Sequence, residues 1–267
     1  MLKIRTKLMN VTAIAACLTV ITMIASCEKE KEVNVKLLDT ETSGEYHMRK
    51  FFYDEQNRIM EMWTYSGKEI SYKTILTYTG EDLTKYEDVY SDAVYTRYYV
   101  KNGNTISWST SVILINEEEE KRENASFDRI LTLNIAGFPE KLEQEILGTY
   151  STIYFTIVNG NLTKSSFVNN GFGNEHLATS EGNCTYGTYR SAYSGCNTPK
   201  WFMFLYFLAN ASHNAMTKSE VESINAMEFE IKSSTTYEYV YDSDRFPTKC
   251  TQYTGEFQSI TEFKYKN

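Results

Sequence analysis

Residues 240–249 read VYDSDRFPTK, and their order indicates how the chain around them folds. A tyrosine-rich segment ends, a turn rich in aspartate follows, and Phe246 begins the next segment. Asp, Asn and Gly in such turns tolerate the backbone conformations that match the twist of paired strands, so the stretch is typical of a β-hairpin. Upstream, Tyr237, Tyr239 and Tyr241 occupy alternate positions and would share one face of a strand.

The same pattern recurs along the chain. Copies lie at 52–59 (FYDEQNRI), 77–85 (TYTGEDLTK), 100–106 (VKNGNTI) and 157–164 (IVNGNLTK), with a weaker copy at 134–141 (NIAGFPEK). The apolar residues Ile59, Leu83 and Ile106 follow one another at intervals of 24 and 23 residues. A period of two strands and two turns predicts a mainly β fold, an antiparallel meander of hairpins that forms a curved or barrel-like sheet.

Two segments interrupt the hairpins. Residues 166–200 are rich in Asn, Gly, Ser and Tyr, and residues 201–211 then read WFMFLYFLANA after Pro199, which suits a helix start. This run is too short to span a membrane and apolar on nearly every side, so it predicts one buried aromatic helix near 200–212, against the concave face of the sheet. Residues 117–123 (EEEEKRE) predict a solvated hairpin tip, with a cation site as the less favoured alternative.

The N-terminus carries a targeting signal. Basic residues and an apolar stretch lead to Ile24-Ala25-Ser26-Cys27, which resembles a bacterial lipobox. We therefore expect residues 1–26 to be a signal peptide, Cys27 to carry lipid, 27–45 to be a charged tether and 46–267 to be a single β-rich domain. The alternative for residues 8–25 is a transmembrane helix.

The charged segment after Cys27 is relevant to where the protein is located in the cell. Glu28 to Glu32 alternates Glu with Lys and resembles the surface-export stretch of some Bacteroidetes lipoproteins, although a plain solvated tether is the simpler interpretation. The expected location is the outer membrane, through the lipid anchor, with exposure at the cell surface left open.

The amino-acid composition limits the kinds of partner that the chain is expected to bind. The net charge is −8, and from Cys27 onward 24 basic residues face 35 acidic ones, a net charge of −11. Such a chain has no electrostatic footprint for nucleic acid. The 21 tyrosines and 14 phenylalanines, with only 3 prolines, favour β-structure.

The remaining cysteines leave two alternatives. Cys184 and Cys196 flank a loop and could form a disulfide in an oxidising envelope, with Cys250 left over. Three free, partly buried thiols fit the sequence equally well.

Motifs for catalysis are missing from the sequence. The three histidines have no metal-ligand spacing, and Cys184 with His176 makes no nucleophile–base motif. Asp242 and Asp244 are expected to cap their own turn. We therefore predict no catalytic residue, metal ion or cofactor, and a protein that is not an enzyme.

Tyrosines offer the candidate binding surface. They could form platforms for a glycan or a partner protein, because tyrosine combines an apolar ring with a polar tip. The alternative is that these rings fill the core and cover the sheet. The candidates are Tyr95, Tyr98, Tyr99, Tyr186, Tyr189 and Tyr193.

Residues 239–249 (YVYDSDRFPTK), preceded by the aromatic helix and by Asn214, Thr217 and Lys218, resemble a family of gut Bacteroidetes lipoproteins of unknown function. The resemblance covers about 46–267 and implies a porin-like fold, and the hairpins also resemble the Tyr-Asp repeats of large secreted proteins. Arg245 departs from the pattern, since the family usually has Gly there. Charges on both faces of strands, as at 85–88, argue against strands that span a membrane.

The leading functional prediction is a lipid-anchored, non-enzymatic envelope protein that binds a polysaccharide or another envelope protein. The alternative is an immunity or inhibitor protein that blocks an antagonistic toxin, for which an acidic surface would suit a basic partner. A hydrolase of extracellular polymers ranks last.

Overall fold

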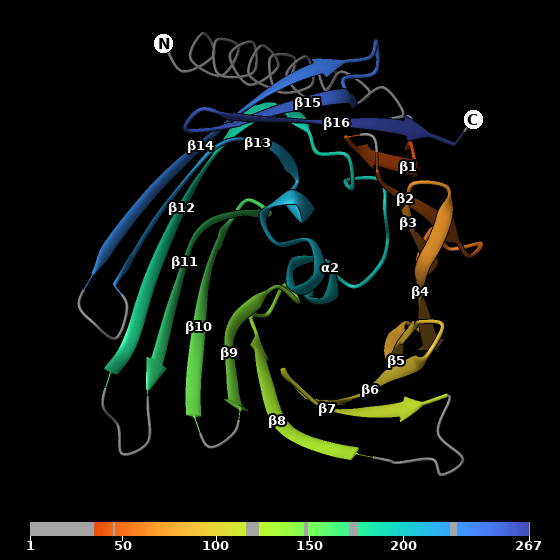
Figure 1. The fold of residues 1–267 in the computed structure, drawn as a ribbon, viewed down its shortest axis with the longest axis vertical. Helices are drawn as coiled ribbons and strands as arrows, with labels where there is room; N and C mark the ends of the chain where they lie inside the picture. Colours follow the sequence, from red (N-terminus) through yellow and green to blue (C-terminus); the bar gives the residue numbers. More distant parts are fainter. Residues whose placement is uncertain are drawn as a thin grey trace, which may run out of the picture. The chain divides into compact units, whose positions relative to one another are not determined.

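The computed structural model describes residues 35–44, 46–115, 123–146, 149–170, 176–224 and 229–266. Within these residues, the predicted hairpins close into a barrel of sixteen strands. Each strand pairs antiparallel with the next one in the chain, and β1 pairs with β16 to close the ring (Figure 1). The strands are β1 Leu38–Ser43, β2 His47–Tyr53, β3 Ile59–Ser66, β4 Glu69–Thr79, β5 Asp82–Val89, β6 Ala93–Asn102, β7 Thr105–Leu114, β8 Glu123–Leu133, β9 Pro139–Ile146, β10 Thr149–Val158, β11 Asn161–Asn170, β12 His176–Arg190, β13 Asn214–Ile224, β14 Glu230–Tyr241, β15 Pro247–Thr254 and β16 Phe257–Tyr265.

Because the strands run up and down in order, every second turn lies at the same end of the barrel. The end that holds the internal helix, described below as the plug, is called the plug end. Its turns are 54–58, 80–81, 103–104, 134–138, 159–160 and 242–246. The opposite end is the mouth end; its described turns include 67–68, 90–92 and 255–256. β1 begins at the plug end and β16 finishes there.

Three plug-end turns share one geometry. The side-chain Oδ1 atoms of Asp54, Asn134 and Asp242 each accept the backbone N–H groups two and four residues later, at 2.9 to 3.1 Å. The residue just before the second donor has a positive φ, which is 78° at Gly137 and 66° at Arg245. The hairpin repeat predicted from the sequence is therefore confirmed at the level of its turns.

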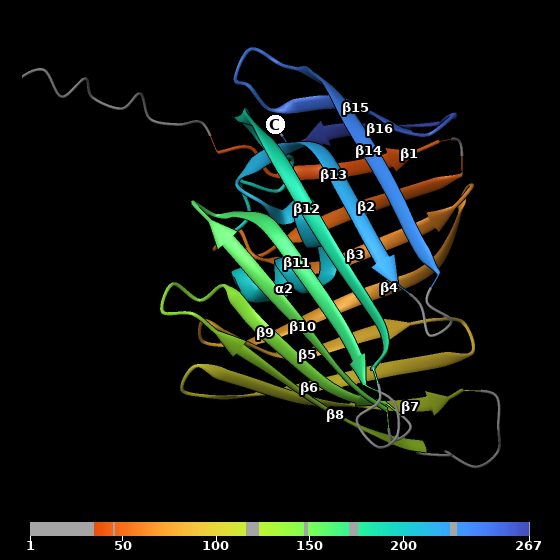
Figure 2. The ribbon, with the colours of Figure 1, turned by 90° about the vertical axis from the view of Figure 1, so that its left-hand side faces the viewer.

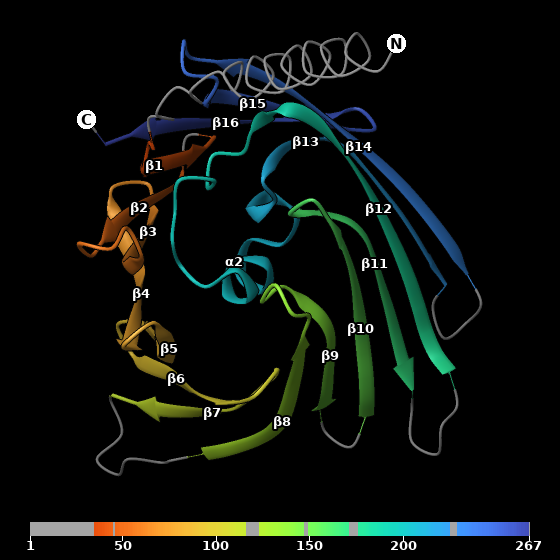
Figure 3. The same ribbon diagram turned by 180° about the vertical axis from the view of Figure 1, so that it is seen from behind.

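The predicted aromatic helix lies inside the barrel (Figures 1 and 3). It consists of α2, Lys200–Phe207, and the 3-10 turn η1, Leu208–Ala211, inserted between β12 and β13; we call α2 and η1 the plug. Figure 2 shows α2 toward the end where β10 ends and β11 begins. The prediction of a buried helix near 200–212 on the concave face is confirmed.

Hydrogen bonds hold the plug to the plug-end turns. The N–H of Asn197 donates to the carbonyl of Asn57 at 2.9 Å, and the N–H of Ile59 donates to Oγ1 of Thr198 at 2.8 Å. On the other side, the N–H of His213 donates to the carbonyl of Gly160 at 2.9 Å. The plug is thus fixed at both of its ends.

Aromatic packing joins the plug to the wall. Trp201 meets Tyr99 of β6 with ring centroids 5.0 Å apart, Phe207 meets Phe51 of β2 at 6.2 Å, and Phe204 meets Phe138 of the turn 134–138 at 5.6 Å. Burying each such ring contributes about 1.5–3 kcal/mol, so these contacts stabilise the packing of the plug inside the barrel.

The predicted domain boundary is too late. β1 begins at Leu38, eight residues before position 46, inside the predicted tether. Leu38 is 1% exposed, and β1 pairs with both β2 and β16, which leaves the sheet no open edge. Lys36–Asn267 forms one compact unit, separate from Met1–Val35. Cys27, residues 28–32 and residues 117–122 lie outside the described residues.

The outer wall carries ion pairs. On β5, for example, Tyr86 faces the core, so Lys85 and Glu87 on either side of it face outward and pair at 2.8 Å. Lys141–Glu143 and Lys218–Glu220 repeat this arrangement on β9 and β13, and Lys164–Glu181 and Lys232–Glu222 pair across neighbouring strands. Among the described residues, no helix is long and apolar enough to cross a membrane.

Candidate functional site

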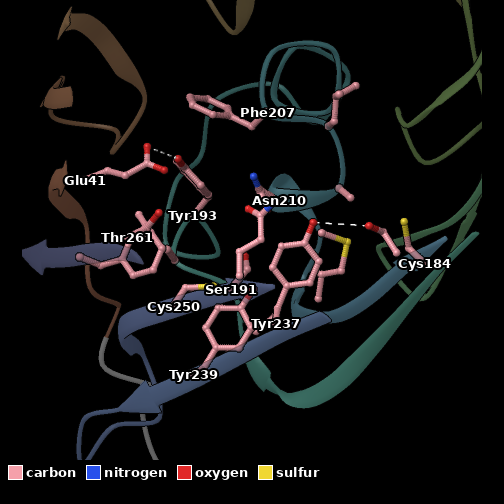
Figure 4. Close-up of a pocket in the computed structure, with 18 residues that line it drawn as sticks. Glu41, Cys184, Ser191, Tyr193, Phe207, Asn210, Tyr237, Tyr239, Cys250 and Thr261 are labelled. Carbon is pink, nitrogen blue, oxygen red and sulfur yellow. Dashed lines mark hydrogen bonds between the residues drawn. The ribbon is translucent and has the colours of Figure 1, made fainter. Parts of the chain in front are cut away.

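A partly open cavity of about 300 Å³ lies inside the barrel, beside the C-terminal half of the plug (Figure 4). Its wall comes from β12 to β16 and from β1, and its floor comes from Phe207 and η1. The volume falls at the lower end of the range of about 300–1,000 Å³ for small-molecule sites. The cavity is therefore the candidate ligand site.

Tyrosines form one wall of the cavity. Strand alternation on β14 points Tyr237 and Tyr239 inward, where both line the space (Figure 4). The hydroxyl of Tyr237 lies 3.4 Å from Oγ of Ser219, and the ring of Tyr239 lies 5.8 Å from that of Tyr241. Burial raises the pKa values of Tyr237 and Tyr239, so both rings present neutral hydroxyls.

Glu41 supplies the carboxylate of the cavity. Its Oε2 accepts the hydroxyl of Tyr193 at 2.7 Å and lies 3.6 Å from Nη1 of Arg49. The guanidinium of Arg49 in turn lies over the ring of Phe207, 5.8 Å from its centroid. Burial raises the pKa of Tyr193 well above its ordinary value, so its hydroxyl stays a donor. Glu41 is therefore held in one orientation by the loop before the plug.

The predicted disulfide between Cys184 and Cys196 is not formed. Cys184, Cys196 and Cys250 are free thiols, as the alternative interpretation had it. Cys184 lines the cavity, whereas Cys196 lies in the loop before α2 with its Sγ 3.0 Å from Oγ1 of Thr198. These separate environments keep the two sulfur atoms apart.

The thiols of the cavity are poor nucleophiles. Burial raises the pKa of Cys184, and it raises that of Cys250 to about 11, so both are protonated at neutral pH. His176 lies eight residues from Cys184 on the same strand, β12, which separates their backbones by about 26 Å. A Cys184–His176 catalytic pair is excluded by this distance.

The six tyrosines chosen from the sequence do not form one surface. Tyr99 and Tyr193 are core residues, 8% and 6% exposed, which corrects their assignment to a binding platform. Tyr95 and Tyr98 are exposed but fall on opposite faces of β6, because they lie three residues apart. The burial of Tyr99 follows from its contacts with both Trp108 and Trp201.

The other two tyrosines also lie apart. Tyr186 is half-buried and donates its hydroxyl to the carbonyl of Leu162 at 2.7 Å, so its polar tip is already used. Tyr189 is 40% exposed and contacts Tyr241 edge-on. Of the six, Tyr193 alone lines the cavity. Tyr237, Tyr239 and Glu41 line the cavity without having been predicted as site residues, and the alternating tyrosines of β14 are the sequence signal for the first two.

A larger hollow of about 720 Å³ lies at the plug end, between turn tips and the start of α2. Two of its three basic side chains are already paired: Lys101 with Asp82 at 2.6 Å, and Arg58 with Asp54 at 2.7 Å. We favour the cavity beside the plug because its hydroxyl and amide groups are less committed. In the described part of the chain, no three His, Cys, Asp or Glu side chains gather to hold a metal ion.

Comparisons with known proteins give distant structural likenesses. No protein-family model matches the chain, and no curated protein matches it. A porin-like protein from Bacteroides vulgatus is 11% identical, with a TM-score of 0.43, over 86% of this chain and 99% of that chain. A porin-like protein from Bacteroides uniformis is 12% identical, with a TM-score of 0.48, over 86% of this chain and 96% of that chain. The barrel class rests on the strand pairing of this chain itself, and the lipoprotein-family resemblance stays a prediction.

Proposed function

We propose that this chain is a lipid-anchored protein of the cell envelope whose barrel binds the end of a polysaccharide in the cavity beside the plug. One observation carries the proposal: a wall formed by Tyr237 and Tyr239 stands beside polar groups of Glu41, Asn210 and Gln252. Aromatic rings stack on the apolar face of a sugar, while carboxylate and amide groups bond its hydroxyls.

The charged side chains on the outer wall favour a barrel that lies outside the lipid bilayer. Lys85, Lys141 and Lys218 face outward in ion pairs. A lysine on the lipid face of a membrane-spanning barrel costs about 2–4 kcal/mol at the midplane. A lipid on Cys27 is therefore the proposed means of attachment, in line with the lipobox-like sequence.

The proposed role is binding without chemistry. The cavity presents hydroxyls, amides and protonated thiols, and its carboxylate, Glu41, is already engaged by Tyr193 and Arg49. Such a set orients a neutral ligand but offers no activated nucleophile.

A glycan array probed with the chain carrying Cys27→Ser, followed by calorimetry with the best ligand, tests the proposal. Tyr239→Ala removes a ring from the cavity and should weaken binding about tenfold, equivalent to about 1.4 kcal/mol. Tyr253→Ala is the matched control, because Tyr253 pairs opposite the outward-facing Thr236 and should leave affinity unchanged. Absence of any glycan ligand, or equal effects of the two variants, would refute the proposal.

The alternative, an immunity protein, would use the outer surface. Its support is the acidic composition, but outward carboxylates such as Glu87, Glu143 and Glu181 already pair with lysines. Protection of a toxin-sensitive strain by expression of the chain, unaffected by Tyr239→Ala, would favour this alternative.

A further inference from the structure

The chain enters the barrel at the plug end and is fastened there. Nζ of Lys36 lies 2.8 Å from Oδ2 of Asp242 and 2.6 Å from Oδ2 of Asp244, both in the plug-end turn 242–246. The N–H of Lys266 donates to the carbonyl of Leu37 at 2.9 Å. Any segment that precedes Lys36 therefore leaves the barrel from the plug end.

The reach of that segment is short compared with the barrel. Cys27 lies nine residues before Lys36, so a fully extended chain between them spans about 30–32 Å, and a flexible chain of this length averages about 16 Å. β14 has 12 residues, which gives a wall about 31 Å tall at a strand tilt of about 40°. A lipid on Cys27 could reach past the mouth end only at full extension.

We infer that the barrel stands on the membrane with its plug end facing the phospholipid surface and its mouth end facing away. This inference rests on the proposed lipid anchor. Exposed apolar side chains occur at both ends, such as Ile135 at a plug-end turn tip and Phe257 at the mouth end, so the position of Lys36 and the short reach from it decide the orientation.

Energy transfer from tryptophan to a dansyl headgroup lipid measures this orientation. The lipidated full chain is reconstituted in phosphatidylcholine vesicles with dansyl-phosphatidylethanolamine, as wild type, Ile135→Trp and Phe257→Trp. Ile135 lies at the tip of a plug-end turn and Phe257, 83% exposed, lies at the mouth end, so both new indoles replace exposed apolar side chains. The signal of the three native tryptophans is subtracted with the wild type.

The expected result is a transfer signal several-fold larger from Ile135→Trp than from Phe257→Trp. Equal signals, or a larger signal from Phe257→Trp, would overturn the orientation. Vesicle flotation separates this failure from failure of the anchor: wild type should float and Cys27→Ser should not. If wild type does not float, the anchor and the orientation are both wrong.

Discussion

Replacing Asp242 separates the two roles of its carboxylate. Oδ1 accepts the N–H groups of Asp244 and Phe246, both at 2.9 Å, and Oδ2 pairs with Lys36. Asp242→Ala removes the turn bonds and the ion pair. Asp242→Asn keeps an acceptor where the equivalent turn naturally has Asn134, so it removes the ion pair and the charge of the turn bonds but not the bonds themselves.

The expected costs follow from these contacts. Two backbone hydrogen bonds to a carboxylate contribute about 3–6 kcal/mol together, against about 1–3 kcal/mol for two neutral ones, so Asp242→Ala should lower the free energy of unfolding by about 3–6 kcal/mol. The ion pair contributes less than about 1 kcal/mol, because 26% and 22% of the Lys36 and Asp242 side chains are exposed to screening solvent. Asp242→Asn should therefore cost about 2–4 kcal/mol, less than Asp242→Ala, because its turn bonds persist as neutral ones.

The pH dependence has a definite sign. Burial acts to raise the pKa of Asp242, but Lys36 and the two backbone N–H groups outweigh it and lower the pKa below its ordinary value. The stabilisation is present above about pH 4 and is lost as the pH falls through the lowered folded-state pKa. The difference between wild type and Asp242→Asn should consequently shrink below about pH 4.

Urea unfolding followed by circular dichroism at pH 7 and pH 3 measures these free energies. Asp244→Ala is the control, since Asp244 pairs with Lys36 at 2.6 Å but does not accept the turn hydrogen bonds. If Asp242→Asn costs as much as Asp242→Ala at pH 7, the turn bonds do not stabilise the hairpin as argued. An Asp244→Ala cost equal to that of Asp242→Ala would have the same meaning.

Three further predictions address the turn, the plug and the cavity. Arg245→Gly should stabilise the protein by about 1 kcal/mol in urea unfolding, because a φ of 66° strains any residue with a side chain; a loss of stability would contradict this. Phe204→Ala should cost about 3–5 kcal/mol in the same assay, since Phe204 is 2% exposed and packs on Phe138; a cost under 1 kcal/mol would mean that the plug is loosely held. Tyr193→Phe should cost about 1–3 kcal/mol by removing the donor to Glu41, and an unchanged urea midpoint would show that this bond is not stabilising.

Much of the fold could be predicted because residues close together in the sequence specify its turns and its helix. The Asx-type turns at 54–58, 134–138 and 242–246 need only a few adjacent residues to specify them, and the apolar run at 201–211 cannot avoid burial. These features together fix a hairpin meander with an internal helix. The number of strands that closes the ring depends on pairing between the two ends of the chain, which no local pattern reports.

The site was harder to predict because it is assembled across the barrel. Glu41 lies in a polar segment that resembles a tether, and its role appears only when β1 pairs with β16. Tyr193 looks like a surface residue in a loop rich in Gly and Ser, yet it packs on Phe51 and Phe207. Side-chain type alone does not distinguish a tyrosine that packs from one that binds.

The pairing of β1 with β16 also sets the order of events during biogenesis. Leu38 is opposite Tyr265, so the closing contact joins residues separated by nearly the whole described chain. The first strand keeps an unpaired edge until the last strand has emerged, and contacts so distant in sequence form slowly. The barrel therefore cannot be completed before β16 has been synthesised, and an escort that shields β1 during this interval would raise the yield of folded protein.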